Sequence, residues 1–240
     1  MGTNKSILTT DEINSYYGES HILHDVSLSV NDGQVMGLLG RNGVGKTTFV
    51  HTLIGFIQPR SGRITFKDED ITNFDSYRIA QRGMSLVPQG RRVLPSLTVK
   101  ENLKLASRLS ANRKDSEWNL ERVLEIFPRL SERLSHGSGQ LSGGEQQMLA
   151  TARALISNPD IILMDEPTEG LAPVIIDRLS DLLSRIRQEG ISILLVEQNL
   201  NFALKHVDTI SLMSKGQIVK QTTPDELENN EELQSQYLGI

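Results

Sequence analysis

The chain has 240 residues, of which 38% are hydrophobic and 23% charged, a balance typical of a soluble globular protein with one large α/β domain or two small lobes. It has no cysteine, which excludes disulfides and cysteine-bound metal, and its net charge of −5 argues against nucleic acid as the main partner. No apolar run approaches the ~20 residues that span a bilayer, and the first residues lack the apolar core of a signal peptide. If the protein works at a membrane, we expect it to do so through other subunits.

Alternating apolar and polar residues predict strands over residues 6–14 and 22–30, and a third, more apolar strand follows over 34–39. Tyr17 falls in the predicted loop between the first two strands. An aromatic ring there can stack on a nucleotide base, although ordinary packing is the commoner role of a tyrosine. The chain therefore opens as an antiparallel unit that leads into residue 40.

The segment 40–48, with the sequence GRNGVGKTT, fits the phosphate-binding P-loop pattern, and it lies between a predicted strand and a predicted helix that starts near Gly45. Its glycines let the backbone turn several N–H groups inward, and the helix start adds the positive end of its dipole. Lys46 brings a charge to the outer phosphates, and the Thr47 hydroxyl can bind Mg²⁺. The sequence therefore predicts a nucleoside triphosphate site made by Gly40, Asn42, Gly43, Gly45, Lys46, Thr47 and Thr48.

The middle of the chain changes from strand to helix patterns. A strand is predicted at 63–66, a short helix at 77–82 and a strand at 84–87, which Gln89 follows closely. A polar amide there can reach a metal-bound water. Residues 97–134 are helical in pattern, with capping-box spacing of Thr98 and Glu101 and a polar connection at 112–117. We expect a helical lobe inserted in the α/β core.

Residues 141–145, with the sequence LSGGE, precede a predicted helix over 146–156. Ser142 and Glu145 have capping-box spacing, so the segment can be a well-capped helix start. It can equally be an anion site, because a helix start offers free N–H groups and a serine hydroxyl.

The apolar run 161–164 predicts a buried strand that ends in Asp165 and Glu166. Ligands bind at the carboxyl ends of parallel strands, so Asp165 is expected to hold Mg²⁺ and Glu166 to polarise an attacking water. The remaining predictions are helices at 174–187 and 200–206, a buried strand at 191–196, a hairpin of 209–213 with 217–220, and a last helix from Pro224.

Together, the P-loop, Gln89, the LSGGE segment and the acidic pair stand in the order and spacing of the ATP-binding cassette (ABC) ATPase subunits of membrane transporters, which the chain resembles over nearly its whole length. The LSGGE signature, about 100 residues after the P-loop, is the specific element. Within that family the chain is most similar to importer ATPases for branched-chain amino acids and to their relatives for urea or short amides. The stretches that carry this likeness are 17–18, 87–91, 127–130, 165–173 and 195–199.

The resemblance implies an α/β fold: a P-loop NTPase of the ABC-ATPase type with an antiparallel β subdomain and an inserted α-helical subdomain. The chain would be one ABC ATPase domain over 1–240. Its core and β lobe would cover about 1–96 and 141–240, and its helical lobe about 97–140.

The resemblance also assigns roles around ATP and Mg²⁺. Two subunits pair head to tail, and each ATP lies between one P-loop and the partner's signature residues Ser142, Gly143 and Gly144. Tyr17 stacks on adenine. Thr47, Gln89 and Asp165 serve the metal, and the catalytic residues are Glu166, Gln198 and Gln89.

The implied partners are a second ABC ATPase subunit, which is a related chain in the cell or a second copy in isolation, and the membrane permease subunits. The helical lobe and the loop around Gln89 would grip the permease. A periplasmic or extracellular solute-binding protein is an indirect partner. Nucleic acid is not expected as a partner. The expected location is the cytoplasmic face of the membrane, as a peripheral subunit.

Two positions depart from the broad family pattern, although both departures occur in the branched-chain amino acid subgroup. Gln198 stands where a histidine is usual, and Ala172 where an aspartate is usual. A neutral amide can bond a phosphate oxygen but carries no charge. The main reading is an importer ATPase for branched-chain or other hydrophobic amino acids. The alternatives are a urea or short-amide importer, a lipid exporter, and a non-catalytic, ATP-dependent dimerisation switch.

Overall fold

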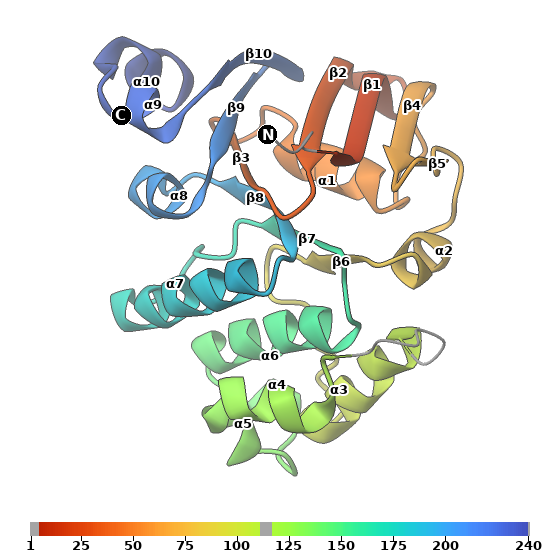
Figure 1. Ribbon diagram of the computed structural model, residues 1–240, viewed down its shortest axis with the longest axis vertical. Coiled ribbons are helices and arrows are strands. Elements are labelled where there is room, and N and C mark those ends of the chain that lie inside the picture. The colour runs from red at the N-terminus through yellow and green to blue at the C-terminus, as the bar shows by residue number, and fades with distance from the viewer. Residues whose placement is uncertain (1–4, 111–116, 240) are drawn as a thin grey trace.

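The computed structural model describes residues 5–110 and 117–239, so the polar connection predicted at 112–117 lies almost wholly outside the described residues. Figure 1 shows two sheets in the upper part of the molecule and helices stacked below them. The sequence order of these elements interleaves the two sheets, because β3 leaves the first hairpin and enters the second sheet before β4 returns to the first.

The smaller sheet is antiparallel, with the order β2-β1-β4-β5. Tyr17 pairs with Ser20 across a tight turn at Gly18, whose positive φ of 58° suits glycine. The prediction that Tyr17 lies in a loop was therefore wrong, because cross-strand pairing carries both strands further than their local patterns indicate. The strands of this sheet are β1 (Ser6–Tyr17), β2 (Ser20–Asn31), β4 (Ser61–Phe66) and β5 (Glu69–Asp70).

The larger sheet has six strands among the described residues, in the order β10-β9-β3-β8-β7-β6. All neighbours in it are parallel except the edge pair of β9 and β10. Its strands are β3 (Val35–Leu39), β6 (Met84–Val87), β7 (Ile161–Asp165), β8 (Ser192–Glu197), β9 (Thr209–Ser214) and β10 (Gln217–Thr222).

Each central strand of the larger sheet is buried on both faces and feeds two cores. In β3, Val35 and Leu39 belong to a core shared with the lower helices, whereas Met36 and Leu38 belong to a core shared with the smaller sheet and α1. The strands β7 and β8 alternate in the same way. This double burial explains why these strands are nearly continuous apolar runs in the sequence.

The helices follow the predicted segments, with two differences. The helix that follows LSGGE begins at Gly143 rather than at residue 146, and the predicted last helix is two short ones. The helices are α1 (Lys46–Leu53), α2 (Ser76–Gln81), α3 (Val99–Ser107), α4 (Leu120–Ile126), α5 (Pro128–Ser131), α6 (Gly143–Ile156), α7 (Pro173–Gln188), α8 (Leu200–His206), α9 (Pro224–Glu228) and α10 (Glu231–Tyr237).

The helices α3, α4 and α5 lie together at the lower end of the molecule and share one apolar core with α6 (Figure 1). The capping box predicted for Thr98 and Glu101 is confirmed at the start of α3. In the described ranges, none of the helices combines the length and the hydropathy that a membrane span requires. The predicted α/β fold with an antiparallel sheet and a group of helices beside a parallel sheet is confirmed.

Candidate nucleotide-hydrolysis site

The carboxyl ends of four parallel strands meet at one edge of the larger sheet. Leu39 pairs with Glu197 across β3 and β8, and Asp165 pairs with Val196 across β7 and β8. The last residue of β6, Val87, pairs with Met164. The register therefore brings the P-loop, the acidic pair, Gln198 and Gln89 to the same edge, where ligands of parallel sheets bind.

The P-loop joins β3 to α1 and leaves the start of that helix open. Its N-cap residue Gly45 has a φ of 111°, and no side chain caps the helix. A Cβ on Gly40 would lie 2.4 Å from the carbonyl oxygen of Met213, so only glycine fits that position. The N–H groups of the first turn are consequently available to an anion.

The turn between β9 and β10 holds the loop from behind. The Gly216 N–H donates to the Val44 carbonyl at 2.8 Å, and the His24 N–H donates to the Gly216 carbonyl at 2.8 Å. A Cβ on Gly216 would lie 2.0 Å from the carbonyl oxygen of Ile22. Gly216 therefore ties the P-loop to β2, a role that sequence reasoning missed because it treated residues 214–216 only as a hairpin turn.

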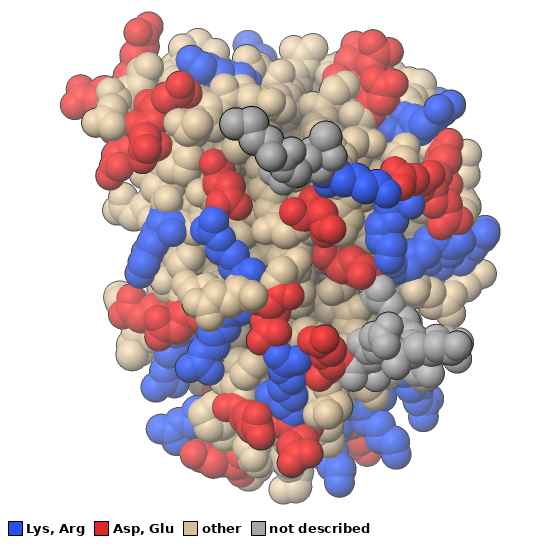
Figure 2. All heavy atoms as spheres, in the orientation of Figure 1, with Lys and Arg blue, Asp and Glu red and all other residues tan. Residues whose placement is uncertain are grey.

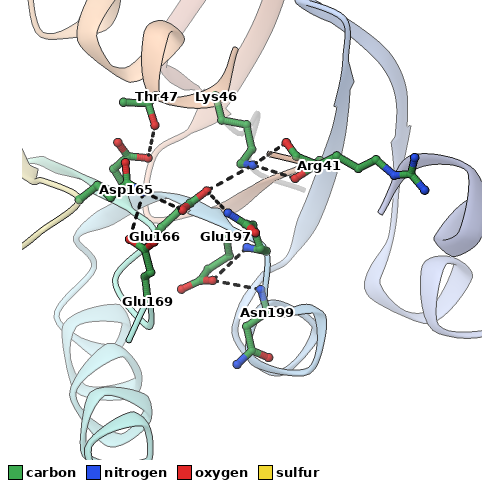
Figure 3. A network of polar contacts seen from close by, with 11 residues as sticks. Arg41, Lys46, Thr47, Asp165, Glu166, Glu169, Glu197 and Asn199 are labelled. Atoms are coloured by element: carbon green, nitrogen blue, oxygen red, sulfur yellow. Dashed lines mark hydrogen bonds and ion pairs between the residues drawn. The ribbon is translucent and has the colours of Figure 1, made fainter. Parts of the chain in front are cut away.

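Lys46 is buried with its ammonium bonded inside the loop. Its Nζ donates to the carbonyl oxygens of Gly40 at 2.7 Å and Arg41 at 3.0 Å. It also lies 3.3 Å from Oε1 of Glu166 (Figure 3). The lysine thus links the P-loop to the acidic pair at the end of β7.

Asp165 ends β7 with only 1% of its surface exposed. Burial raises the pKa of this carboxyl to about 6, the hydrogen bond from Thr47 acts in the opposite direction, and the charge of Glu166 adds to the rise. The Thr47 hydroxyl donates to Oδ1 of Asp165 at 3.3 Å. A buried carboxylate beside a hydroxyl is the oxygen donor set that a hard cation such as Mg²⁺ prefers, and such a cation would offset the cost of ionising Asp165.

Glu166 is held by bonds to both of its carboxylate oxygens. Oε1 accepts from the Gln198 amide at 2.6 Å, and Oε2 accepts from the Gln89 amide at 3.0 Å. The residue has a φ of 49°, and its N–H donates to the Val196 carbonyl at 2.9 Å. A left-handed conformation is uncommon for glutamate and is typical of residues that a site holds in a fixed position.

Glu197, the last residue of β8, is a buried carboxylate that sequence reasoning did not single out. One of its oxygens accepts from the Thr168 N–H at 3.0 Å. The other accepts from the N–H groups of Gln198 at 3.0 Å and Asn199 at 3.2 Å (Figure 3). Burial raises its pKa, and these hydrogen bonds act in the opposite direction. Glu197 therefore joins the loops that follow β7 and β8. Its place after a buried strand was the signal in the sequence.

The signature segment starts α6 as a complete capping box, as its spacing predicts. The Ser142 hydroxyl accepts from the Glu145 N–H at 3.3 Å, and the Ser142 N–H donates to the Glu145 carboxylate at 2.8 Å. A Cβ on Gly144 would lie 2.8 Å from Ile175 of α7, and one on Gly143 would lie 2.5 Å from the Arg91 guanidinium. Among the described residues, no hydrogen bond or ion pair joins residues 142–144 to residues 40–48.

The other predicted nucleotide-binding residues lie on or near the loop. Tyr17, the last residue of β1, is 51% exposed. Asn42 is exposed, and nothing lies within 4 Å of a Cβ built on Gly43. Thr48 is buried, and its carbonyl accepts from the Thr52 hydroxyl at 2.9 Å. Tyr17, Asn42 and Gly43 are therefore accessible, whereas Thr48 is buried within α1.

The chain is similar to known proteins over nearly its whole length. A family model described as ABC transporter matches residues 23–169. A high-affinity branched-chain amino acid transport ATP-binding protein, BraG of Pseudomonas aeruginosa, is 42% identical over 97% of this chain and 100% of its own. A lipopolysaccharide export system ATP-binding protein, LptB of Haemophilus influenzae, is 33% identical over 98% of both chains.

Solved structures agree with these relatives. A nucleotide-free ATP-binding cassette from an ABC transporter has a TM-score of 0.81 at 31% identity, over 93% of this chain and 94% of that one. A dimeric post-hydrolysis state of a cassette bound to ADP and Pi has a TM-score of 0.79 at 25% identity, over 90% of this chain and 98% of that one. The chain therefore belongs to the ABC transporter family, as an ATP-binding and ATP-hydrolysing subunit.

Proposed function

We propose that the chain energises an importer for branched-chain or other hydrophobic amino acids. The BraG relative supports this solute class, because its identity of 42% exceeds the 33% of the lipopolysaccharide export relative. The export relative makes lipid export the second candidate, and a urea or short-amide importer is a variant of the first. Uptake of labelled leucine, isoleucine and valine by cells with and without the chain tests the proposal. Loss of urea uptake alone, or of lipid export alone, would contradict it.

In the proposed mechanism, Glu166 orients and deprotonates the attacking water. The observation that carries this role is the position of its carboxylate, between the amides of Gln89 and Gln198 and within 3.3 Å of Lys46. A phosphate group competes with Glu166 for the Lys46 ammonium, because both are anions. Once Lys46 turns to the phosphates, Glu166 keeps the Gln198 amide and is free to accept a proton from water.

Mg²⁺ would be held by Thr47 and Asp165, directly or through water, with the side-chain amide oxygen of Gln89 as a further ligand. When bound, the ion supplies positive charge to the phosphate oxygens. The buried Asp165, whose pKa is raised to about 6, supports this role, because ionisation there is favoured by a nearby cation. The rest of the coordination shell would come from the nucleotide and water.

We also propose that the working unit is a pair, in which Ser142, Gly143 and Gly144 of one subunit meet the ATP on the other. Two observations support this arrangement. In the part of the chain that the structure describes, no hydrogen bond joins the signature residues 142–144 to the P-loop of the same chain. The similar cassette with ADP and Pi is a dimer. Tyr17, which is half-exposed, stacks on adenine in the same proposal. The second subunit is a related chain in the cell, and a second copy can replace it in isolation.

The permease is proposed to dock on a groove of about 580 Å³ that lies between α2, β6 and α3. Four large apolar side chains that line it, Phe56, Tyr77, Leu105 and Leu109, are between 37% and 60% exposed. Pro88 and Arg92, on either side of Gln89 in sequence, also line it, so an apolar helix of the permease seated there would touch the loop that carries Gln89. This surface joins the proposed helical lobe, about 97–140, to the core.

The docking proposal can be tested by crosslinking, because the chain has no cysteine of its own. A single cysteine at Tyr77 should crosslink to a permease that carries a cysteine in a cytoplasmic helix, and one at Lys220 on β10 should not.

A second test concerns catalysis: with the permease present, the pair should hydrolyse ATP only when Mg²⁺ is added. An absence of such turnover would favour the non-catalytic dimerisation switch. In the main proposal, the importer ATPase works at the cytoplasmic face of the membrane and meets a solute-binding protein only indirectly.

A further inference from the structure

A second groove, of about 650 Å³, lies on another part of the molecule. It runs over α6, with α7 on one side and the junction of α4 and α5 on the other (Figure 1). Its apolar lining includes Phe127, Met148, Ile175 and Leu182. The volume is in the range of sites that bind small organic molecules, which combine an apolar lining with a few polar anchors.

The charged residues around this groove are mainly basic. Four arginines and two carboxylates line it, and Figure 2 shows basic and acidic side chains interspersed over the lower half of the molecule, where these helices lie. Two of the arginines are already paired: Arg129 lies 3.0 Å from Glu132, and Arg133 lies 2.8 Å from Glu145.

The other two arginines, Arg178 and Arg185, stand two helical turns apart on α7 and are exposed. Within the described ranges, neither of these side chains makes a hydrogen bond or an ion pair, although Asp181 lies between them on the helix. Two unpaired guanidinium groups therefore border an apolar floor. Guanidinium binds carboxylate through two parallel hydrogen bonds, which makes arginine the side chain best suited to this anion.

We propose that this groove binds a small amphiphilic carboxylate. Its apolar body lies on Phe127, Met148 and Leu182, and its acid group meets Arg178 and Arg185. The inference goes beyond transport-coupled ATP hydrolysis and does not depend on it. Because Ser142 and Gly144 also line the groove, the occupant lies beside the start of α6.

Octanoate and octanol are suitable probes, because they share an apolar chain and differ in charge. Met148 supplies the signal: with methionine methyl groups labelled with carbon-13, its resonance can be assigned with Met148→Leu among the 6 methionines of the chain. Titration of octanoate should shift the Met148 methyl resonance to saturation at one molecule per chain. Octanol should bind at least about tenfold more weakly, because it offers no charge to the arginines.

The double variant Arg178→Gln/Arg185→Gln should weaken octanoate binding by at least about tenfold, since both charged anchors are lost. Arg63→Gln on β4 is the matched control. It removes one positive charge from an exposed pair with Asp70, whose side chains are 70% and 54% exposed. It should leave octanoate affinity within about twofold, because Arg63 does not line the groove. Unchanged ATP binding by each variant shows that its fold is intact.

Three results would overturn the proposal. The first is no Met148 shift at millimolar octanoate, or a shift of many methionines that does not saturate. The second is equal affinity for octanoate and octanol, or equal octanoate affinity in the parent and the double variant. The third is a self-association of the parent that the double variant abolishes in sedimentation, because the groove would then be covered by a second copy.

Discussion

Two helices of this protein begin in glycine-rich segments, but only one of them has side chains that cap the N–H groups of its first turn. No side chain caps α1 at Gly45. In contrast, α6 begins with a capping box in which the Glu145 carboxylate accepts the Ser142 N–H at 2.8 Å. Both starts have the dipole and N–H groups that bind anions, but α6 already carries an anion of its own chain.

This difference supports our proposal that the start of α1, and not that of α6, binds nucleotide in the single chain. Around α1, charged and polar groups bond to one another across the sheet edge, from Lys46 to Glu166 and from Thr47 to Asp165. In our proposal, the phosphates and the cation lie between these groups. The start of α6 is stable without a ligand, so in our proposal it meets ATP only when a partner brings one.

The largest expected effect tests whether the chemistry belongs to the α1 side. Glu166→Gln should lower ATP turnover by ~10²–10⁴-fold, because it removes the general base. ATP binding should persist, since Lys46 loses a competing carboxylate. Glu169→Gln is the control: Glu169 accepts from the same Gln89 amide at 3.0 Å but is exposed, so turnover should stay within about twofold. Phosphate release at saturating Mg-ATP measures both, and a turnover of Glu166→Gln near that of the parent would show that the base is elsewhere.

The second effect concerns the cost of keeping Asp165 ready for a cation. Its folded-state pKa of about 6 lies above the ordinary value of 3.8. The folded state therefore holds the proton to higher pH than the unfolded state does, and nucleotide-free stability falls as pH rises from 3.8 to about 6. Asp165→Asn removes this loss, so at pH 7 the variant should be more stable by at most about 3 kcal/mol.

Urea unfolding without nucleotide at several pH values tests this prediction. The two proteins should have similar free energies of unfolding near pH 4 and separate as pH rises to 7. In the presence of Mg-ATP the parent should gain more stability than Asp165→Asn, because only the parent offers a carboxylate to the cation. Parallel pH profiles would show that Asp165 is ionised without cost.

The third effect compares glycines at the two helix starts. Gly45→Ala should destabilise the fold by about 1–3 kcal/mol, because alanine is strained at a φ of 111° and its Cβ would lie 3.1 Å from Leu23. Gly143→Ala meets only the end of the flexible Arg91 side chain and gains helix propensity, so it should change stability by less than about 1 kcal/mol. Denaturant unfolding measures both. Equal losses would remove the contrast between a strained start and a relaxed one.

The smallest effect separates capping from ligand binding at α6. Ser142→Ala should cost about 1 kcal/mol of stability, as should Thr98→Ala, which removes the capping box of α3. Only Ser142→Ala should also lower the ATP turnover of the pair. If both variants keep the same turnover, Ser142 is a cap and nothing more.

Much of the fold could be predicted from the sequence, because its signals are local. The strand predicted at 84–87 is β6, and the helix predicted at 200–206 is α8. The capping boxes at Thr98 and Ser142 depend on residues three apart and are both confirmed. The predicted start at residue 146 lies three residues after the observed start of α6 at Gly143, although the capping-box spacing already indicates Ser142 as the N-cap.

The rest depends on contacts between distant segments. Tyr17 belongs to β1 because it pairs with Ser20, and the short strand β5 exists because it pairs with β4. The bond between Glu197 and Thr168 requires β7 and β8 to be neighbours, which no local pattern states. The P-loop, Gln89, the acidic pair and Gln198 reach one sheet edge by the same strand order. The proposed roles of the P-loop and the acidic pair follow from residue chemistry, whereas those of Tyr17, Gln198 and the signature toward ATP follow from the family resemblance.

The most direct test of the shared site mixes two inactive variants. Lys46→Ala damages the P-loop, and Ser142→Arg damages the exposed signature without touching the buried core. If each ATP lies between one P-loop and the partner's signature, a hybrid pair has one site with both defects and one intact site. Each variant alone should be inactive, and an equal mixture should regain about a quarter of the parent's ATP turnover per chain, because half of random pairs are hybrid. A mixture as inactive as its components would contradict the account and place P-loop and signature function within a single chain.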